Sequence, residues 1–317
     1  MTFSTCIDTN DQSIGPSVFG FLSLWRVAIL RRENVVVDAP ALLVAKLGAI
    51  VSYASLELAL LILVAIGSFE VTTVTIASSS LRLFAALCMI SLSFFDHGRS
   101  PRPSILLNTY VSLTFLFDIA QVRTYWLSSS TKPEVAYTSI FTASFVIKVV
   151  IVLLEARRKS KWVKWDSKEH SPEETSGIYS LGVYFWLNRL FLEGYRHVLR
   201  IPDLYPLDQK MAAGQLHSRL ARNLSYSKLS GDRYGLIRAL AQSLTVPLIL
   251  PIPARIALIG FTFCQPFLIR GLIDYLSQPV ESSNIGYGFI GASALIYSGI
   301  AFSMAFYAYF HHRMLAI

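Results

Sequence analysis

The sequence predicts an all-α polytopic membrane protein, and three observations lead to that fold class. Of its 317 residues, 53% are hydrophobic and only 15% are charged, and the mean hydropathy is +0.50. Soluble domains carry roughly 25% charged residues, so the composition argues against a soluble enzyme and against a disordered chain. Six apolar stretches are each long enough to cross about 30 Å of hydrocarbon. The cysteines Cys6, Cys88 and Cys264 lie in separate segments, which excludes a disulfide scaffold and a cysteine zinc cluster.

Six long apolar stretches are the predicted membrane spans. They are Ala41–Ile66, Thr73–Phe95, Ser104–Trp126, Glu134–Leu154, Ala254–Leu276 and Gly286–Phe310. A seventh stretch, Ser17–Leu30, has only 14 residues and contains Arg26. A span needs roughly 20 residues. The seventh stretch therefore either crosses the membrane as a short helix or lies at the interface.

Lys and Arg are distributed very unevenly between the loops. Ten of them fall on one side of the predicted spans: Arg31, Arg32, Arg99, Arg102, Arg157, Arg158, Lys159, Lys161, Lys164 and Lys168. The opposite loops contain only Lys132. Because basic loops stay in the cytoplasm, we expect Lys161 and Asp203 on the cytoplasmic side and Ser129 and Ser282 on the other. Membrane topology thus explains the net charge of +8, so the lipid bilayer is the expected partner and nucleic acid is not.

A long polar stretch, residues 155–245, separates the fourth span from the fifth. Ser171-Pro172-Glu173-Glu174 predicts the start of a helix, with an N-cap, a proline and two acids in the first turn. Gly194 is placed to end that helix. A second helix is expected from about Asp208 to Leu224, and a short amphipathic one over Tyr234–Leu244. The chain therefore divides into membrane domain 1–154, cytoplasmic linker 155–245 and membrane segment 246–317.

Several segments of the chain match a family pattern in co-linear order. In the linker they are Ser171–Gly177, Trp186–Phe191, Gly194–Arg196 and Asp203–Asp208, and elsewhere Asp11–Pro16, Phe117–Thr124, Ala257–Pro266 and Leu272–Leu276. Together they resemble C-class ABC transporters of the multidrug-resistance-associated-protein type, especially fungal members. The resemblance implies that 1–154 is the extra N-terminal membrane domain and that 155–245 is the lasso linker with an elbow helix. It also implies that 246–317 begins the first core transmembrane domain, of the ABC type 1 exporter kind.

The resemblance implies a component of an exporter of drugs, organic anions or secondary metabolites, in the plasma or vacuolar membrane. ATP drives transport in the full-length family. This chain contains no G-x-x-x-x-G-K-[ST] loop, so we expect no ATP hydrolysis and no cofactor in the chain by itself. It carries no catalytic motif and is not expected to be an enzyme.

Two alternatives to the exporter component stay open. The chain is expected to be truncated, with a missing ABC core or another membrane protein as its partner. It would then be part of a transporter, a non-transporting scaffold or regulatory module docked on another membrane protein, or a truncated product without function.

Among the charged residues within the predicted spans, where hydrocarbon makes a charge costly, three share a depth. Glu57, Arg82 and Asp118 fall at nearly one depth, roughly 12–14 Å from the outer boundary at 1.5 Å per residue. We expect them to form an intramembrane charge cluster with a structural role, in which Arg82 pairs with one acid. The alternative is that each finds an unrelated polar neighbour.

The remaining candidate residues lie in the linker and in the fifth span. Arg270 is a candidate for the substrate pathway, and the alternative is an arginine that reaches toward the outer headgroups. Four apolar side chains are expected to hold the linker helix against the membrane domain: Phe185, Trp186, Leu190 and Phe191. No metal site is expected.

Overall fold

The computed structural model describes residues 14–66, 73–157, 159–160, 162–164, 170–206, 208, 211, 213–223, 234–277 and 283–315. Within these residues six helices are long and apolar enough to cross a membrane: Pro40–Ile66, Thr75–Arg99, Ile105–Ser128, Lys132–Glu155, Pro247–Ser277 and Asn284–Leu315. They coincide with the six spans predicted from hydropathy, with ends that differ by a few residues. The prediction of an all-α polytopic membrane protein is confirmed.

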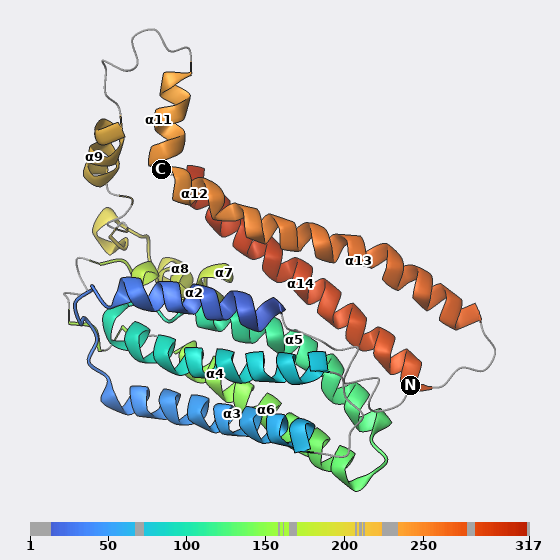
Figure 1. The fold of residues 1–317 in the computed structure, drawn as a ribbon. Coiled ribbons are helices and arrows are strands. Elements are labelled where there is room, and N and C mark those ends of the chain that lie inside the picture. Colours follow the sequence, from blue (N-terminus) through green and yellow to red (C-terminus); the bar gives the residue numbers. More distant parts are fainter. Residues whose placement is uncertain are drawn as a thin grey trace. The chain divides into compact units, whose positions relative to one another are not determined.

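The described chain forms two compact units. The N-terminal bundle comprises Met1–Asp166 with Glu174–Ile178, and the C-terminal unit comprises Ser167–Glu173 with Tyr179–Ile317. Five helices build the bundle (Figure 1): α2 (Ile14–Leu30), α3 (Pro40–Ile66), α4 (Thr73–Arg99), α5 (Ile105–Ser128) and α6 (Lys132–Glu155). Helix α3 packs against α4 and α6, α2 packs against α4 and α5, and α5 packs against α6.

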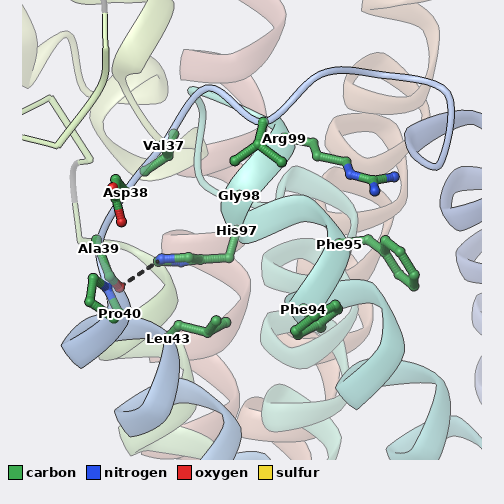
Figure 2. A pocket seen from close by; sticks show the side chains of 11 residues that line it. Val37, Asp38, Ala39, Pro40, Leu43, Phe94, Phe95, His97, Gly98 and Arg99 are labelled. Atoms are coloured by element: carbon green, nitrogen blue, oxygen red, sulfur yellow. Dashed lines mark hydrogen bonds between the residues drawn. The ribbon is translucent and has the colours of Figure 1, made fainter.

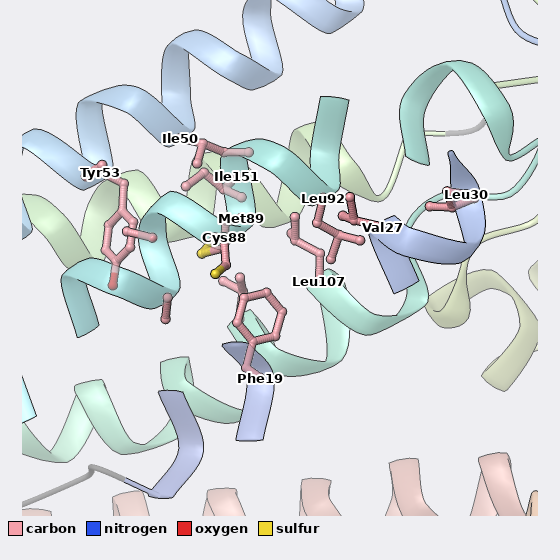
Figure 3. Close-up of a cluster of buried hydrophobic side chains, with 14 residues drawn as sticks. Phe19, Val27, Leu30, Ile50, Tyr53, Cys88, Met89, Leu92, Leu107 and Ile151 are labelled. Atoms are coloured by element: carbon pink, nitrogen blue, oxygen red, sulfur yellow. The ribbon is translucent and has the colours of Figure 1, made fainter. Parts of the chain in front are cut away.

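An apolar core joins all five helices of the bundle (Figure 3). Its main cluster consists of Phe19, Val27, Leu30, Ile50, Tyr53, Ala54, Ala85, Ala86, Cys88, Met89, Leu92, Leu107, Val111 and Ile151. A smaller cluster consists of Leu60, Val64, Tyr125, Tyr137 and Phe141. Small side chains at Ala54, Ala85 and Ala86 let the helix backbones approach closely, as is usual where membrane helices pack.

The short stretch 17–30 is part of the bundle. It belongs to the 17-residue helix α2, whose Phe19, Val27 and Leu30 lie in the core. The Phe19 ring stacks on Tyr110 of α5 with ring centroids 4.0 Å apart. At Gly20 a Cβ atom would lie 2.7 Å from the Phe84 ring, so glycine permits the close contact between α2 and α4. Helix α2 is thus held by packing against its neighbours, and whether it crosses the membrane or lies at the interface stays open.

The connection between α5 and α6 is fixed by a capping box. Thr131 is the N-cap of α6, and Glu134 accepts hydrogen bonds from the backbone N–H of Thr131 at 2.9 Å and of Ser130 at 2.7 Å. Pro133 in the first turn has no N–H to leave unsatisfied. The chain therefore reverses direction at a defined residue, which sets where α6 begins beside α5.

The C-terminal unit is built around two long helices, α13 (Pro251–Ser277) and α14 (Ser283–Leu315), which pack against each other (Figure 1). Shorter elements precede them in the sequence, and of these Glu174–Ile178 belongs to the N-terminal bundle. They are the 3-10 turns Pro172–Thr175, Phe185–Leu187 and Ile201–Asp203 and the helices α7 (Ile178–Gly182), α8 (Asn188–Arg196), α9 (Ala213–Asn223), α11 (Gly235–Ser243) and α12 (Thr245–Ile249).

The prediction of one continuous helix from Ser171 to Gly194 is wrong. The segment is divided into two 3-10 turns and two short α-helices. Tyr184 has a φ of 54°, in the left-handed region that an α-helix cannot continue through. Gly194 does not end α8, which runs on to Arg196. The next helix, α9, begins at Ala213 rather than near Asp208.

Some predictions fall outside the described residues. These concern Cys6, the segment Asp11–Ser13, Lys161 and Ser282. The domain boundaries after residues 154 and 245 stay predictions.

Candidate functional site: buried ion pairs and an arginine network

A buried ion pair joins α5 and α6 inside the N-terminal bundle. The Lys148 ammonium lies 2.5 Å from the Asp118 carboxylate, and the two side chains are only 9% and 5% exposed. The ammonium also lies 5.3 Å from the centroid of the Tyr53 ring on α3. Since an unpaired charge at this depth is costly, the pair fixes α5 and α6 against each other and places α3 beside them.

The other two residues of the predicted charge cluster lie near this pair. Glu57 is 4% exposed, and Arg82 interacts electrostatically with both Glu57 and Asp118. Tyr125 and Tyr137 also interact electrostatically with the same guanidinium. The structure thus places the three predicted residues in one electrostatic neighbourhood, and a structural role for the cluster stays a prediction.

Lys148 was missed by the sequence analysis. It lies within the apolar stretch Glu134–Leu154, so an inventory of every charge within the spans would have found it. Its presence changes the charge balance, because Asp118 has a lysine partner of its own. The expectation that Arg82 pairs with one of the two acids stays a prediction.

A second buried ion pair joins α3 to the end of α6. Lys46 and Glu155 are 2.9 Å apart, and their side chains are 1% and 3% exposed. The other oxygen of Glu155 accepts a hydrogen bond from the backbone N–H of Ser104, the N-cap of α5, at 3.2 Å. One carboxylate therefore links α3, α5 and α6 at the same end of the bundle.

Lys159 closes the carboxyl end of α4. Its fully buried ammonium donates hydrogen bonds to the backbone carbonyls of Asp96, His97 and Ser100 at 3.0, 3.1 and 3.1 Å. The last carbonyls of a helix have no partner within it, and a cation there complements the helix dipole. Burial, and secondarily the charge of Lys46, lowers the pKa of Lys159 to about 8. The chain that leaves α6 is thereby attached to the end of α4.

In the C-terminal unit, Arg313 of α14 binds two acids from distant parts of the linker. Its guanidinium forms ion pairs with Glu173 and Asp208, through different nitrogens. Tyr309, one turn earlier on α14, donates a hydrogen bond to Glu173 at 2.5 Å and accepts one from Arg313 at 3.2 Å. The three charged side chains are 16%, 12% and 2% exposed for Arg313, Glu173 and Asp208. We call these four residues the Arg313 network.

Aromatic packing supports the Arg313 network. The Tyr184 and Tyr309 rings meet edge to face, with centroids 5.9 Å apart. A Cβ atom at Gly182 would lie 2.7 Å from the Phe306 ring, so glycine is needed for this approach of α7 to α14. The linker is thus attached to α14 by charge and by packing at adjacent points.

The remaining predicted residues are less enclosed. The Arg270 side chain is 85% exposed and lies 4.0 Å from Asp274, one turn along α13. Phe185 and Phe191 are exposed by 61% and 64%, whereas Trp186 and Leu190 are partly buried. The substrate and docking roles of these residues stay predictions. In the described part of the chain, no group of three or more His, Cys, Asp or Glu side chains is placed to hold a metal ion.

The buried pair predicts a strong thermodynamic coupling between Asp118 and Lys148. Asp118→Asn and Lys148→Met should each lower the free energy of unfolding by about 3–5 kcal/mol, because each change strands a buried charge. The double variant should cost clearly less than the sum. Thermal and denaturant unfolding of the purified protein measures these values.

The matched control for this cycle is the exposed pair Asp38–Lys164, with 3.3 Å between its charged atoms and side chains 67% and 61% exposed. Asp38→Asn and Lys164→Met should each cost about 0–1 kcal/mol. Additive effects in the double variant of Asp118 and Lys148 would show that the pair does not form in the folded protein.

The Arg313 network predicts that one substitution loosens the whole linker. Arg313→Gln should leave both acids without a counter-ion and speed limited proteolysis within residues 178–208 by about tenfold or more, since breaking a buried pair costs about 3 kcal/mol. Arg313→Lys should restore the stability only in part, because an ammonium lacks the planar set of N–H donors with which a guanidinium binds two carboxylates through separate nitrogens.

Arg196→Gln is the control for Arg313→Gln, because Arg196 is exposed in the same linker. It should leave the cleavage rate unchanged. Equal cleavage of the Arg313→Gln variant and the unaltered protein would show that the network does not hold the linker in solution.

The comparisons with known proteins agree with the architecture described above. No family model matches the chain. The chain is 55% identical over 342 aligned positions to the ABC-type transporter braE of Annulohypoxylon truncatum, and 42% identical over 347 to the ABC transporter FGM5 of Gibberella zeae. Each alignment covers 99% of this chain and 23% of the relative.

A third relative is the ABC multidrug transporter lscH of Purpureocillium lilacinum, which is 34% identical over 244 positions, or 76% of this chain and 16% of that protein. The chain thus spans about a quarter or less of the length of these relatives. Over nearly its whole length, the chain is homologous to part of the fungal ABC-type transporters.

Proposed function

We propose that the chain is the N-terminal membrane part of an ABC exporter of the C-class, multidrug-resistance-associated-protein type. In this proposal residues 1–154 are the extra N-terminal membrane domain, 155–245 are the lasso linker and elbow helix, and 246–317 begin the first core transmembrane domain. The observation that carries the proposal is the alignment of 99% of the chain with ABC transporters more than four times as long. The name of the lscH relative supports drugs as one substrate class.

The burial of the long helices supports a division of labour within such an exporter. In α3 and α4, 33% and 44% of the most apolar stretch is buried inside the chain's own fold, whereas the figures for the spans of α13 and α14 are 0% and 6%. The helices of the N-terminal bundle therefore bury part of their apolar surface against one another. They also bury the two ion pairs Asp118–Lys148 and Lys46–Glu155. The α13–α14 pair leaves its faces open for other helices, as the first two helices of a core transmembrane domain would.

In this proposal the Arg313 network couples the position of the linker to the position of the first core transmembrane domain. Glu173 and Asp208 belong to the segment that resembles the lasso linker, and Arg313 belongs to the second core helix. ATP would be bound by other parts of the transporter, because this chain contains no phosphate-binding loop. Arg270 is proposed to face the pathway of drugs, organic anions or secondary metabolites, and Glu57, Arg82 and Asp118 are proposed to stabilise the N-terminal bundle.

Reconstitution from two pieces tests the proposal. The part of the braE relative that this chain does not match would be expressed alone and together with this chain. The two pieces should co-purify in mild detergent, and ATPase activity should require the braE piece while this chain alone shows none. A chain shortened to residues 1–245, without α13 and α14, is the control and should not restore a stable complex.

The same experiment distinguishes the alternative of a non-transporting scaffold. A scaffold would bind the intact braE relative and would not complement its incomplete piece. That outcome, or a chain that binds neither form, would contradict the proposed role as a transporter component.

The proposed orientation places the linker in the cytoplasm of a plasma-membrane or vacuolar protein. After replacement of the three native cysteines, single cysteines at Ser129 and Asp203 should react with an impermeant maleimide from opposite faces of sealed vesicles, with Asp203→Cys on the cytoplasmic face. The reason is the excess of basic residues in the loops on the linker side. Labelling of both positions from the same face would contradict this topology.

A further inference from the structure

A pocket of about 290 Å³ opens where α3 begins and α4 ends (Figure 2). Its wall is mostly apolar and includes Val35, Leu43 and Phe94. Val35 and Phe94 are exposed by 63% and 52%. Because Pro40 starts one candidate membrane span and Arg99 ends another, we expect the pocket at the boundary between hydrocarbon and headgroups, where its exposed apolar side chains would meet lipid.

Arg99 lines the pocket, and Arg31 lies over a ring that also lines it. The guanidinium carbons of Arg31 and Arg99 lie 5.4 and 5.1 Å from the centroid of the same ring, Phe95, which lines the pocket. Arg99 donates a hydrogen bond to the carbonyl of Leu30 at 2.8 Å. Neither arginine forms an ion pair with a described acid, in contrast to Arg26, which pairs with Asp96. Two cations without a carboxylate partner among the described residues thus lie beside Phe95, which is part of the apolar wall.

The other polar groups of the pocket are compatible with an anionic headgroup. Asp38, its acidic residue, is paired with Lys164 at 3.3 Å, so its charge is balanced. His97 is 3% exposed, and its Nε2 bonds the carbonyl of Ala39 at 3.1 Å, which makes Nε2 the protonated nitrogen (Figure 2). Its Nδ1 has no hydrogen-bond partner in the described structure. That nitrogen is buried and lacks a partner among the described residues, and His97 lines the pocket, so a small donor group that enters beside the ring would satisfy it.

We propose that this pocket binds an anionic phospholipid whose headgroup also carries a hydrogen-bond donor, such as phosphatidylserine. The phosphate lies between Arg31 and Arg99, the donor faces His97, and an acyl chain covers Val35, Leu43 and Phe94. Basic residues at the membrane surface attract anionic lipids by about 1 kcal/mol each, and the apolar wall adds the burial of the chain. This inference needs only membrane insertion and is independent of the transport function proposed above.

The test uses the full chain, purified and delipidated in a neutral detergent. Dioleoyl phosphatidylserine or dioleoyl phosphatidylcholine is added, and bound lipid is counted by native mass spectrometry. The unaltered protein should bind phosphatidylserine roughly tenfold or more tightly than phosphatidylcholine. Arg31→Gln with Arg99→Gln should abolish this preference. Arg32→Gln with Arg189→Gln, which removes the same charge from exposed positions outside the pocket, should preserve it.

Further arms keep the proposal open to contradiction. Because Arg99→Gln also removes the bond to Leu30, the exposed Arg31→Gln is measured alone and should weaken phosphatidylserine binding about fivefold. Phe94→Ala should weaken binding of dioleoyl phosphatidylserine but not of glycerophosphoserine, which has no acyl chains. An unchanged preference in both arginine variants overturns the proposal. Displacement of phosphatidylserine by an equal concentration of inorganic phosphate also overturns it, because the pocket would then be a site for a free anion.

Discussion

Two lysines inside an apolar helix bundle require counter-ions, and the arrangement of the N-terminal bundle depends on where those counter-ions lie. Lys148 finds Asp118, and Lys46 finds Glu155. Helix α6 contributes one residue to each pair, the cation Lys148 to the first and the anion Glu155 to the second. A rotation or a shift of α6 by one residue would separate both pairs at once. The pairs therefore select one register among the many that apolar packing alone would allow, which is the best-attested use of buried charge.

Hydropathy was sufficient to predict the fold class and the six long helices, because span length and apolar composition are local properties of the sequence. Which charged residues pair with each other is not a local property of the sequence. Glu57, Arg82 and Asp118 could be assigned a common depth from helix rise alone, but the partner of Asp118 depends on how α5 and α6 are rotated about their axes. Lys46 and Glu155 were not recognised as a pair, because their helices adjoin only in the folded bundle.

The linker shows the opposite limit of sequence reasoning. Its apolar spacing and its Ser-Pro-Glu-Glu start predicted one helix, but the left-handed backbone at Tyr184 breaks the segment and no residue pattern signalled it. Nothing in the sequence pattern singled out Arg313. Its partners lie 140 and 105 residues earlier in the chain, and no periodicity relates positions so far apart. The site that ties the linker to α14 thus became visible only in three dimensions.

The Arg313 network also has a consequence for how such chains vary in length. Glu173 and Asp208 are brought together on one guanidinium, so the segment between them is a closed loop. The entropic free-energy cost of closing a flexible loop rises slowly with its length, by only about 0.6 kcal/mol for each doubling. Gly182 and Tyr184 within this loop pack against α14, so insertions and deletions are cheap only in the parts of the loop that make no such contacts. In homologous chains, those parts should vary in length while the three closing residues and the packed turn stay fixed.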